Sequence, residues 1–437
     1  MQGIGALSWL AVFLATSSTG LLQDHGELHS EKVKGCVRAD QPAQGPQLLN
    51  LGQRWKGTKP LAELRVKISE LTSVESSFEF RTFDPEGLII YGDVQEKAEW
   101  FILALRSGIP EMHIGKTGVS LTVSGGPLLN DGQWHRLLLK STGRFLAQLV
   151  VLEVDGKVIL NAGLHSRDAQ TPPTGHIRLA LGGMLISTSE LFTELLPPMD
   201  GCIRRWNWLN QNSSWLQDLS TSKPCFEHLS QGSYFSGAGL ASFHSQDFPP
   251  GDVENWMLTI EMTVRPDEWK GTLLVITSKD HRPLLTLTMH EKEGSQALQL
   301  DVKEVSLVLS HRPVRSCLET SLLLRVSAHG VVVRTNQSEE RGELGDFAAW
   351  KQAWEEGTTL SFGGVPELLE GTGFPGQDYF QGCVGKIRVQ GRELDLDSAH
   401  YKHDSIWSHS CPEWTEHSQG DSKLLQEPQN REDAAST

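Results

Sequence analysis

The same ordered set of residues occurs twice in this chain, about half a chain apart. The first copy has Gly-Gly at 182–183 and Gly-Cys at 201–202, and the second has Gly-Gly at 363–364 and Gly-Cys at 382–383. One more cysteine follows each copy. This recurrence predicts two tandem domains. We expect a local disulfide to close each domain near its C-terminal end, Cys202–Cys225 in the first and Cys383–Cys411 in the second.

The N-terminal segment and the cysteines indicate the compartment. Residues 4–15 are apolar and small residues follow at 16–20, which is the pattern of a signal peptide over residues 1–20. None of the six cysteines forms a CxxC pair, so a zinc ribbon or a thioredoxin-type centre is not expected. We therefore expect a secreted, extracellular protein, in which disulfides persist. Cys36 and Cys317 could pair, stay free or link two chains.

Charge and hydropathy exclude some partners. The 437 residues carry a net charge of −15, which argues against nucleic acid or an anionic membrane as the partner, although solubility is the plainer reason for such acidity. No segment approaches the roughly 18 apolar residues of a membrane span, so membrane insertion is not expected. In a secreted chain, the triplets that begin at Asn212 and Asn336 are acceptors for N-glycosylation.

The segment 76–93 has strong local signals. Phe78, Phe80 and Thr82 alternate with their neighbours at the period of a strand. The run Asp-Pro-Glu-Gly at 84–87 is typical of a turn, and residues 88–91 suit a second strand. These features predict a β-hairpin whose tip carries two carboxylates. Such a tip is either a site for a hard cation or simply a polar turn.

The rest of the chain consists of short strand-like runs separated by polar turns, with little helical periodicity. This texture predicts an all-β sandwich. Residues 21–57 are expected to be a flexible N-terminal arm and residues 412–437 a disordered tail. The expected strands cover residues 61–71, 100–105, 119–123, 134–140, 146–154 and 177–181 in the first half, and 256–264, 272–277, 284–289, 297–302, 322–326 and 331–335 in the second.

Several of these motifs together resemble laminin G-like domains. They are Ser-Ser-Phe-Glu-Phe-Arg-Thr at 76–82, Asp-Gly-Gln-Trp-His at 131–135 and Gly-Cys at 201–202. With Ile-Trp-Ser-His-Ser-Cys at 406–411, the pair of domains is similar to the sex hormone-binding globulin family. The resemblance implies two antiparallel β-sandwiches of the jelly-roll type, at 58–225 and 226–411.

That family carries one steroid inside the first sandwich, so the resemblance implies a steroid site here. Ser76 matches the serine that binds the ring A oxygen, and Glu99 and Lys116 stand where the family has an aspartate and an asparagine at the other end. As alternatives, Ser76 is an ordinary strand serine and the other two are solvated edge residues. Ser141 stands where the family can have methionine. Positions that match the lining of the slot, or are plain core, are Gly92, Phe101, Leu139, Ile177 and Leu209.

The resemblance also bears on metals, assembly and activity. Asp84 and Glu86 match a calcium site, and the alternative is a polar turn. The family's zinc positions read Glu99, Thr117 and Thr174 here, so we do not expect zinc. No catalytic motif is present, and we expect a binding protein rather than an enzyme. The leading hypothesis is a carrier of androgens and estrogens, and the alternative is a calcium-dependent adhesive or receptor-binding pair. A homodimer through the first domain would involve Val123 and Leu160.

Overall fold

The computed structural model describes residues 36–38 and most of residues 48–416. The larger internal gaps are 95–98, 142–148, 164–174, 192–194, 212–214, 216–222, 250–254, 312–318 and 370–377. The expected signal peptide, Asn212, Thr117, Thr174 and Cys317 fall outside the described residues. In the described part of the chain, no helix has the length and apolar character needed to cross a membrane.

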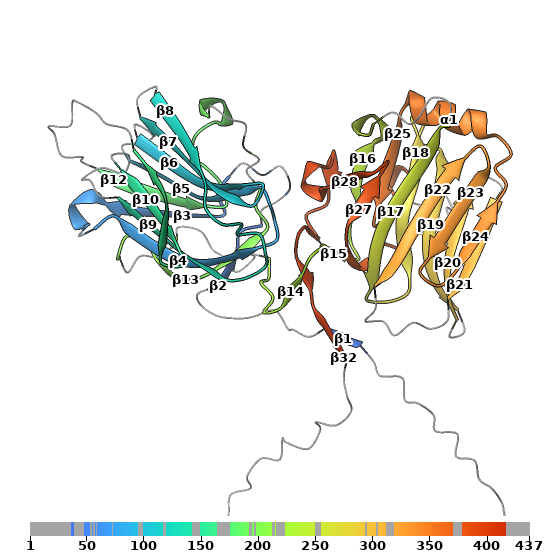
Figure 1. Cartoon of the computed structure of the whole chain (residues 1–437), viewed down its shortest axis with the longest axis horizontal. Helices are drawn as coiled ribbons and strands as arrows, with labels where there is room; N and C mark the ends of the chain where they lie inside the picture. Colours follow the sequence, from blue (N-terminus) through green and yellow to red (C-terminus); the bar gives the residue numbers. More distant parts are fainter. Residues whose placement is uncertain are drawn as a thin grey trace, which may run out of the picture.

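The described chain forms two antiparallel β-sandwiches side by side, which confirms the predicted fold class (Figure 1). In the first, one sheet has six strands in the order β11-β10-β9-β4-β13-β2 and the other has six in the order β3-β12-β5-β6-β7-β8. The strands are β2 (Leu48–Asn50), β3 (Ala62–Lys67), β4 (Glu75–Thr82), β5 (Gly87–Val94), β6 (Glu99–Arg106), β7 (Ile109–Lys116), β8 (Val119–Ser124), β9 (His135–Ser141), β10 (Val150–Val154), β11 (Lys157–Ala162), β12 (His176–Leu181) and β13 (Gly201–Asn207).

The second sandwich repeats this plan. One sheet has the order β24-β23-β22-β17-β26-β15-β30 with β27 and β28 beside it, and the other has the order β21-β20-β19-β18-β25-β16-β29. The strands are β15 (Ser233–Ser236), β16 (Ala241–His244), β17 (Met257–Pro266), β18 (Gly271–Ser278), β19 (Pro283–Lys292), β20 (Ser295–Val302), β21 (Val305–His311), β22 (Thr320–Ser327), β23 (Gly330–Thr335), β24 (Glu339–Gly342), β25 (Thr358–Phe362), β26 (Gln381–Val384), β27 (Ile387–Val389), β28 (Arg392–Leu394), β29 (Tyr401–Lys402) and β30 (Ile406–Trp407).

The core of each sandwich is formed by alternate residues of its strands. Along β17, residues 258, 260, 262 and 264 are buried and the residues between them are more exposed, so one face of the strand lies against the opposite sheet. Each sandwich therefore encloses its own apolar cluster, with Phe78 and Phe80 in the first and Phe235 and Phe362 in the second.

The predicted hairpin at 76–93 is wrong. The two strands form where expected, but β4 pairs with β9 and β13, whereas β5 pairs with β6 and β12. The turn at 83–86 therefore carries the chain from one sheet of the sandwich to the other. Local turn chemistry indicates a reversal of direction, but it does not determine whether the two strands pair with each other.

The boundaries of the expected arm and tail also need correction. Within the arm expected at 21–57, β2 pairs with β13 and belongs to the first sandwich. Within the tail expected at 412–437, β31 (Cys411–Pro412) pairs with β14 (Leu229–Ser230), and β32 (Trp414–Glu416) pairs with β1 (Cys36–Arg38). These segments form strands because their backbone groups find partners far away in the sequence, which local composition does not reveal.

One α-helix, α1 (Phe347–Glu356), was not predicted. The Asp346 carboxylate caps its first turn by accepting from the Ala349 amide at 3.0 Å, and Gly357 ends it with a φ of +116°. Trp350 and Trp354 lie one turn apart and are buried against the core of the second sandwich. Short 3-10 turns occur at Ile68–Glu70, Thr188–Glu190, Ser245–Asp247, Glu367–Leu369 and Leu396–Ser398.

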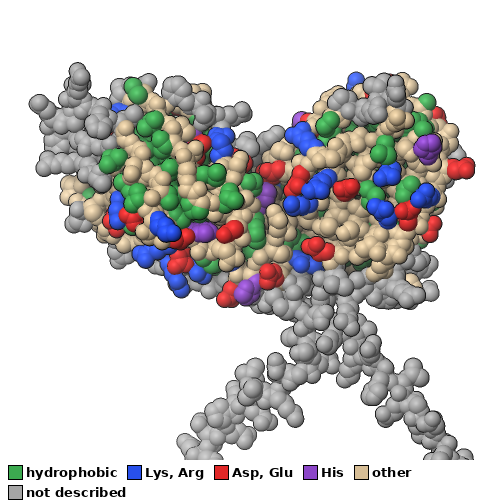
Figure 2. All heavy atoms as spheres, viewed as in Figure 1, with side chains coloured by type: hydrophobic (Ala, Val, Ile, Leu, Met, Phe, Trp, Pro, Cys, Tyr) green, Lys and Arg blue, Asp and Glu red, His purple; other side chains and the backbone are tan. Residues whose placement is uncertain are grey.

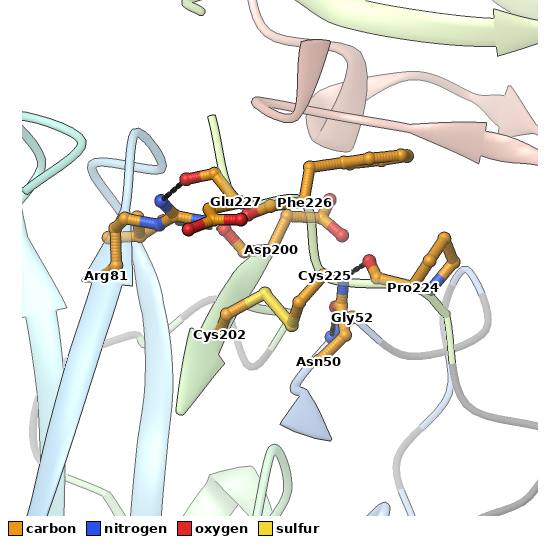
Figure 3. The surroundings of a disulfide bond; sticks show 10 residues. Asn50, Gly52, Arg81, Asp200, Cys202, Pro224, Cys225, Phe226 and Glu227 are labelled. Carbon is orange, nitrogen blue, oxygen red and sulfur yellow. Dashed lines mark hydrogen bonds between the residues drawn. A yellow bond between two sulfur atoms is a disulfide. The ribbon is translucent and has the colours of Figure 1, made fainter. Parts of the chain in front are cut away.

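The disulfides Cys202–Cys225 and Cys383–Cys411 are the two pairs expected from the repeat. Figure 3 shows that the first anchors the linker between the sandwiches. Beside it, the Asn50 side-chain amide donates to the Pro224 carbonyl at 2.8 Å, and the Arg81 guanidinium donates to the carbonyls of Phe226 and Glu227. The linker is therefore held against the first sandwich by covalent and polar contacts.

Candidate functional site

The candidate ligand site lies between the two sheets of the first sandwich. Residues that alternate along a strand face the same side, so the inward face of β6 carries Glu99, Phe101 and Leu103. Four of the expected lining residues belong to one buried apolar cluster, and each is at most 5% exposed: Phe101, Leu139, Ile177 and Leu209. The interior is therefore apolar at these positions, which suits a rigid hydrocarbon ligand.

Ser76 is a polar group inside this apolar region. It lies on β4 opposite Leu139 and is 5% exposed. Its Oγ accepts a hydrogen bond from the Leu209 amide at 3.1 Å. Leu209 lies in the turn after β13 and has a φ of +54°, which aims its amide back at β4. A serine hydroxyl that accepts in this way still has its own hydrogen to donate.

Gly92 makes room for the aromatic ring of Phe101. The two residues are cross-strand partners on β5 and β6. A Cβ added at Gly92 would lie 2.3 Å from the Phe101 ring and 2.9 Å from Leu179. Only glycine allows the ring to lie across the strand at this point, so the shape of the interior depends on its missing side chain.

Glu99 and Lys116 are cross-strand partners at the ends of β6 and β7. Their side chains form an ion pair through Glu99 Oε1, and they are 12% and 20% exposed. The second carboxylate oxygen, Oε2, is buried, and no hydrogen-bond donor within the described residues reaches it. Because an ionised carboxylate only accepts hydrogen bonds, this oxygen suits a ligand hydroxyl.

The structure thus brings together the residues predicted for the site. Ser76 is bonded to Leu209, Gly92 contacts Phe101, and Glu99 lies two residues before Phe101 on the same face. Ser141 ends β9 and is partly exposed, with its amide bonded to the Val74 carbonyl at 2.9 Å. Sequence reasoning missed Trp208, which is 3% exposed and packs on Phe78. No motif marks it, because its position depends on the turn after β13.

Asp84 and Glu86, the two carboxylates expected at a calcium site, lie in the turn between β4 and β5. Asp84 is 2% exposed, and its two oxygens accept from the amides of Glu86 at 3.0 Å and Asp200 at 2.8 Å. The Glu86 carboxylate accepts from the Ser107 amide at 2.7 Å. Across the junction between the sandwiches, Asp84 faces His409 of the second domain at 3.8 Å.

The junction is a dense cluster of charges. Burial, with Asp397 and Asp200 nearby, raises the pKa of Asp84 well above its ordinary value, although His409 opposes the rise. Burial alone would lower the pKa of His409, but the surrounding carboxylates, led by Asp84, raise it to about 10. Lys402 contacts Asp397 and lies 3.8 Å from Asp200. Positive side chains of the second domain therefore meet carboxylates of both domains here.

Comparisons with known proteins agree with the fold. The Laminin G domain family matches residues 80–214. Sex hormone-binding globulin of Rattus norvegicus is 32% identical over 82% of this chain and 85% of its own length, and the Homo sapiens protein is 30% identical over 92% and 96%. Growth arrest-specific protein 6 of Mus musculus is 28% identical over 87% of this chain and 58% of its own length.

A solved structure with the same architecture is the mouse laminin alpha1 chain, domains LG4-5. It covers 87% of this chain and 98% of its own, with a TM-score of 0.63 at 20% identity. At 20% sequence identity, this similarity establishes a shared fold and nothing about function.

Proposed function

Because the chain belongs to the sex hormone-binding globulin family, we propose that it is a carrier that binds sex steroids reversibly between the sheets of its first sandwich. The names of these relatives describe binding proteins, and this chain is likewise a binding protein rather than an enzyme. The observation that carries the proposal is the Ser76 hydroxyl, which is buried in an apolar interior, accepts a hydrogen bond from the Leu209 amide and keeps its own hydrogen to donate.

The polar groups match the chemistry of a steroid. A steroid is an apolar plate with an oxygen at each end, so its site needs a hydrogen-bonding group at each end. We assign Ser76 to a ring A ketone and the Glu99–Lys116 pair to the opposite hydroxyl, with Gly92, Phe101, Leu139, Ile177 and Leu209 along the plate. A nanomolar affinity for about twenty heavy atoms needs about 0.6 kcal/mol per atom, which requires nearly complete burial.

The decisive experiment is equilibrium binding of radiolabelled dihydrotestosterone and estradiol to the purified secreted protein. Saturable nanomolar binding at one site per chain is the expected result. An absence of saturable binding for both steroids would refute the carrier function. In that case the calcium-dependent adhesive or receptor-binding alternative would be tested next, by binding to immobilised glycans with and without calcium.

We also propose a calcium ion at the domain junction. The ligand atoms of Asp84, Asp397 and His409 lie within 4.8 Å of one another, and the buried Asp397 Oδ2 finds no hydrogen-bond partner among the residues that the structure describes. Calcium prefers oxygen ligands, so Asp84 and Asp397 would hold it, with Glu86 in the adjoining turn. Its charge would offset the repulsion between the carboxylates.

A thermal melt in calcium against one in chelator tests this proposal. We expect chelation to lower the Tm of the wild type and to have little effect on Asp84→Asn. Equal melting temperatures of the wild type would show that Lys402 and His409 alone balance the cluster.

The remaining proposals concern secretion, glycosylation and assembly. We propose that residues 1–20 are removed during secretion and that Asn336, exposed after β23, carries an N-glycan, as does Asn212.

We propose a homodimer through the edge strands β8 and β11, which expose Val119 and Val158 at 59% and 56%. Of the two expected contacts, Val123 is half-buried but Leu160 is only 7% exposed, so Leu160 supports the edge from within. Exposed hydrophobic side chains are visible on this domain in Figure 2.

The N-terminal sequence and the mass of the secreted protein, before and after glycosidase, test the first two proposals. Analytical ultracentrifugation of the wild type and Val123→Glu tests the third. An unchanged monomer mass in both would exclude the dimer.

A further inference from the structure

Trp208 carries a buried hydrogen-bond donor that the protein does not use. The side chain is 3% exposed, and its indole Nε1 has no hydrogen-bond partner within the described residues. Leaving such a donor unpaired in an apolar interior costs about 1–3 kcal/mol. Most buried donors in native proteins are paired, and each exception calls for an explanation.

The position of Trp208 suggests what the donor is for. Trp208 directly precedes Leu209, whose amide bonds Ser76. Its ring packs on Phe78, with centroids 5.3 Å apart, and Phe78 lies two residues after Ser76 on the same inward face of β4. Trp215 packs edge-on against the Trp208 indole, with ring centroids 5.6 Å apart. The unused donor therefore belongs to the same end of the interior as the Ser76 hydroxyl.

This end of the site offers two donors. Ser76 Oγ accepts one hydrogen bond from the Leu209 amide and keeps its own hydrogen to donate, and an indole N–H only donates. A ketone oxygen, with two lone pairs, can accept from both groups.

We propose that Trp208 is a further ligand-contacting residue, whose indole N–H donates to a carbonyl oxygen of the ligand at the Ser76 end. The inference rests on the proposed steroid-carrier function and adds a residue that sets specificity. With Glu99 Oε2 as an acceptor that the described residues leave unfilled at the other end, the site matches a ligand with a ketone at one end and a hydroxyl at the other.

Nuclear magnetic resonance of the indole protons tests the proposal on the whole secreted protein. The chain has 13 tryptophans, and Trp208→Phe assigns the Nε1–H resonance of Trp208. Dihydrotestosterone should move this resonance downfield. The analogue that lacks the ring A oxygen should leave it near its position in the free protein. Trp208→Phe should weaken dihydrotestosterone binding about five- to thirty-fold and the binding of the analogue by less than two-fold.

The matched control is Trp215→Phe, the same chemical change in the neighbouring indole, which should leave the preference for the ketone unchanged. If the wild type binds neither steroid, the carrier function itself fails. If it binds both while the Trp208 resonance responds to them equally, the role of Trp208 is refuted. Should Trp208→Phe not fold, nuclear Overhauser contacts to Phe78 assign the resonance, and the comparison of the two ligands decides.

Discussion

Ser76 has two hydrogen-bonding tasks that a single substitution removes together. Its Oγ accepts a hydrogen bond from the Leu209 amide at 3.1 Å, and in the proposed complex its hydroxyl donates one to the ring A ketone. Ser76→Ala leaves the buried Leu209 amide without its acceptor, so the free energy of unfolding should fall by about 1–3 kcal/mol. Loss of the bond to the ligand should weaken binding by about 1–2 kcal/mol, which is roughly five- to thirty-fold in Kd.

A double-mutant cycle separates these two effects. Wild type and Ser76→Ala are each titrated with dihydrotestosterone and with the analogue that lacks the ring A oxygen. If Ser76 contacts the ketone, the substitution should weaken the first ligand much more than the second, since the analogue has no oxygen to lose. Ser77→Ala is the matched control, because the neighbouring serine on β4 points to the opposite face and should leave both affinities unchanged.

Equal loss of affinity for both ligands would refute the assigned role. It would mean that Ser76 shapes the site only by holding the turn at Leu209. A stability measurement by denaturant titration completes the design, because it reports the Leu209 amide without any ligand.

Three further perturbations probe other parts of the structure. Lys116→Asn should change the ranking of dihydrotestosterone against estradiol in competition binding, and identical rankings would show that Lys116 points away from the ligand. Gly92→Ala should lower the free energy of unfolding by about 1–3 kcal/mol in denaturant titration and weaken steroid binding, since the added Cβ would lie 2.3 Å from the Phe101 ring. If the variant keeps both its stability and its steroid affinity, the Phe101 ring is free to move. Burial lowers the pKa of His135, but hydrogen bonds to Asp155 and Asp131 outweigh it and raise the pKa above the usual 6.5. The stability from this group should therefore be complete below about pH 6.5 and be lost as pH rises through the raised pKa. The pH profile of the Tm should lose this component in His135→Gln, and superimposable profiles would contradict the reasoning.

Much of the strand content could be predicted because alternation is strong in β17 and β22, and because a short apolar run marks β6. β7 (Ile109–Lys116) was not predicted, since Pro110 and Gly115 break the usual pattern. The structure explains the glycine: a Cβ at Gly115 would lie 2.1 Å from the Trp100 indole. The exchange of sheets between β4 and β5 was missed because pairing partners are chosen by the whole sandwich and not by the turn that joins two strands.

In the candidate site, too, some residues could be predicted from the sequence and some contacts could not. Ser76, Glu99 and Lys116 were recognised by their match to a family, and strand register then explains why they share one interior. The contacts of Leu209 and Trp208 could not be foreseen. Both residues lie in the turn after β13, where Leu209 has a positive φ, and periodicity does not encode such a turn.

The pairing of β1 with β32 places the two ends of the folded chain next to each other (Figure 1). Topologically, the protein is close to a ring opened at one point. New termini could therefore be made in an exposed loop, with β1 and β32 joined by a short linker. A donor and an acceptor fluorophore attached to β1 and to β32 would transfer energy efficiently only while this pair of strands persists. Such a pair would report opening of the junction between the domains independently of any ligand in the first.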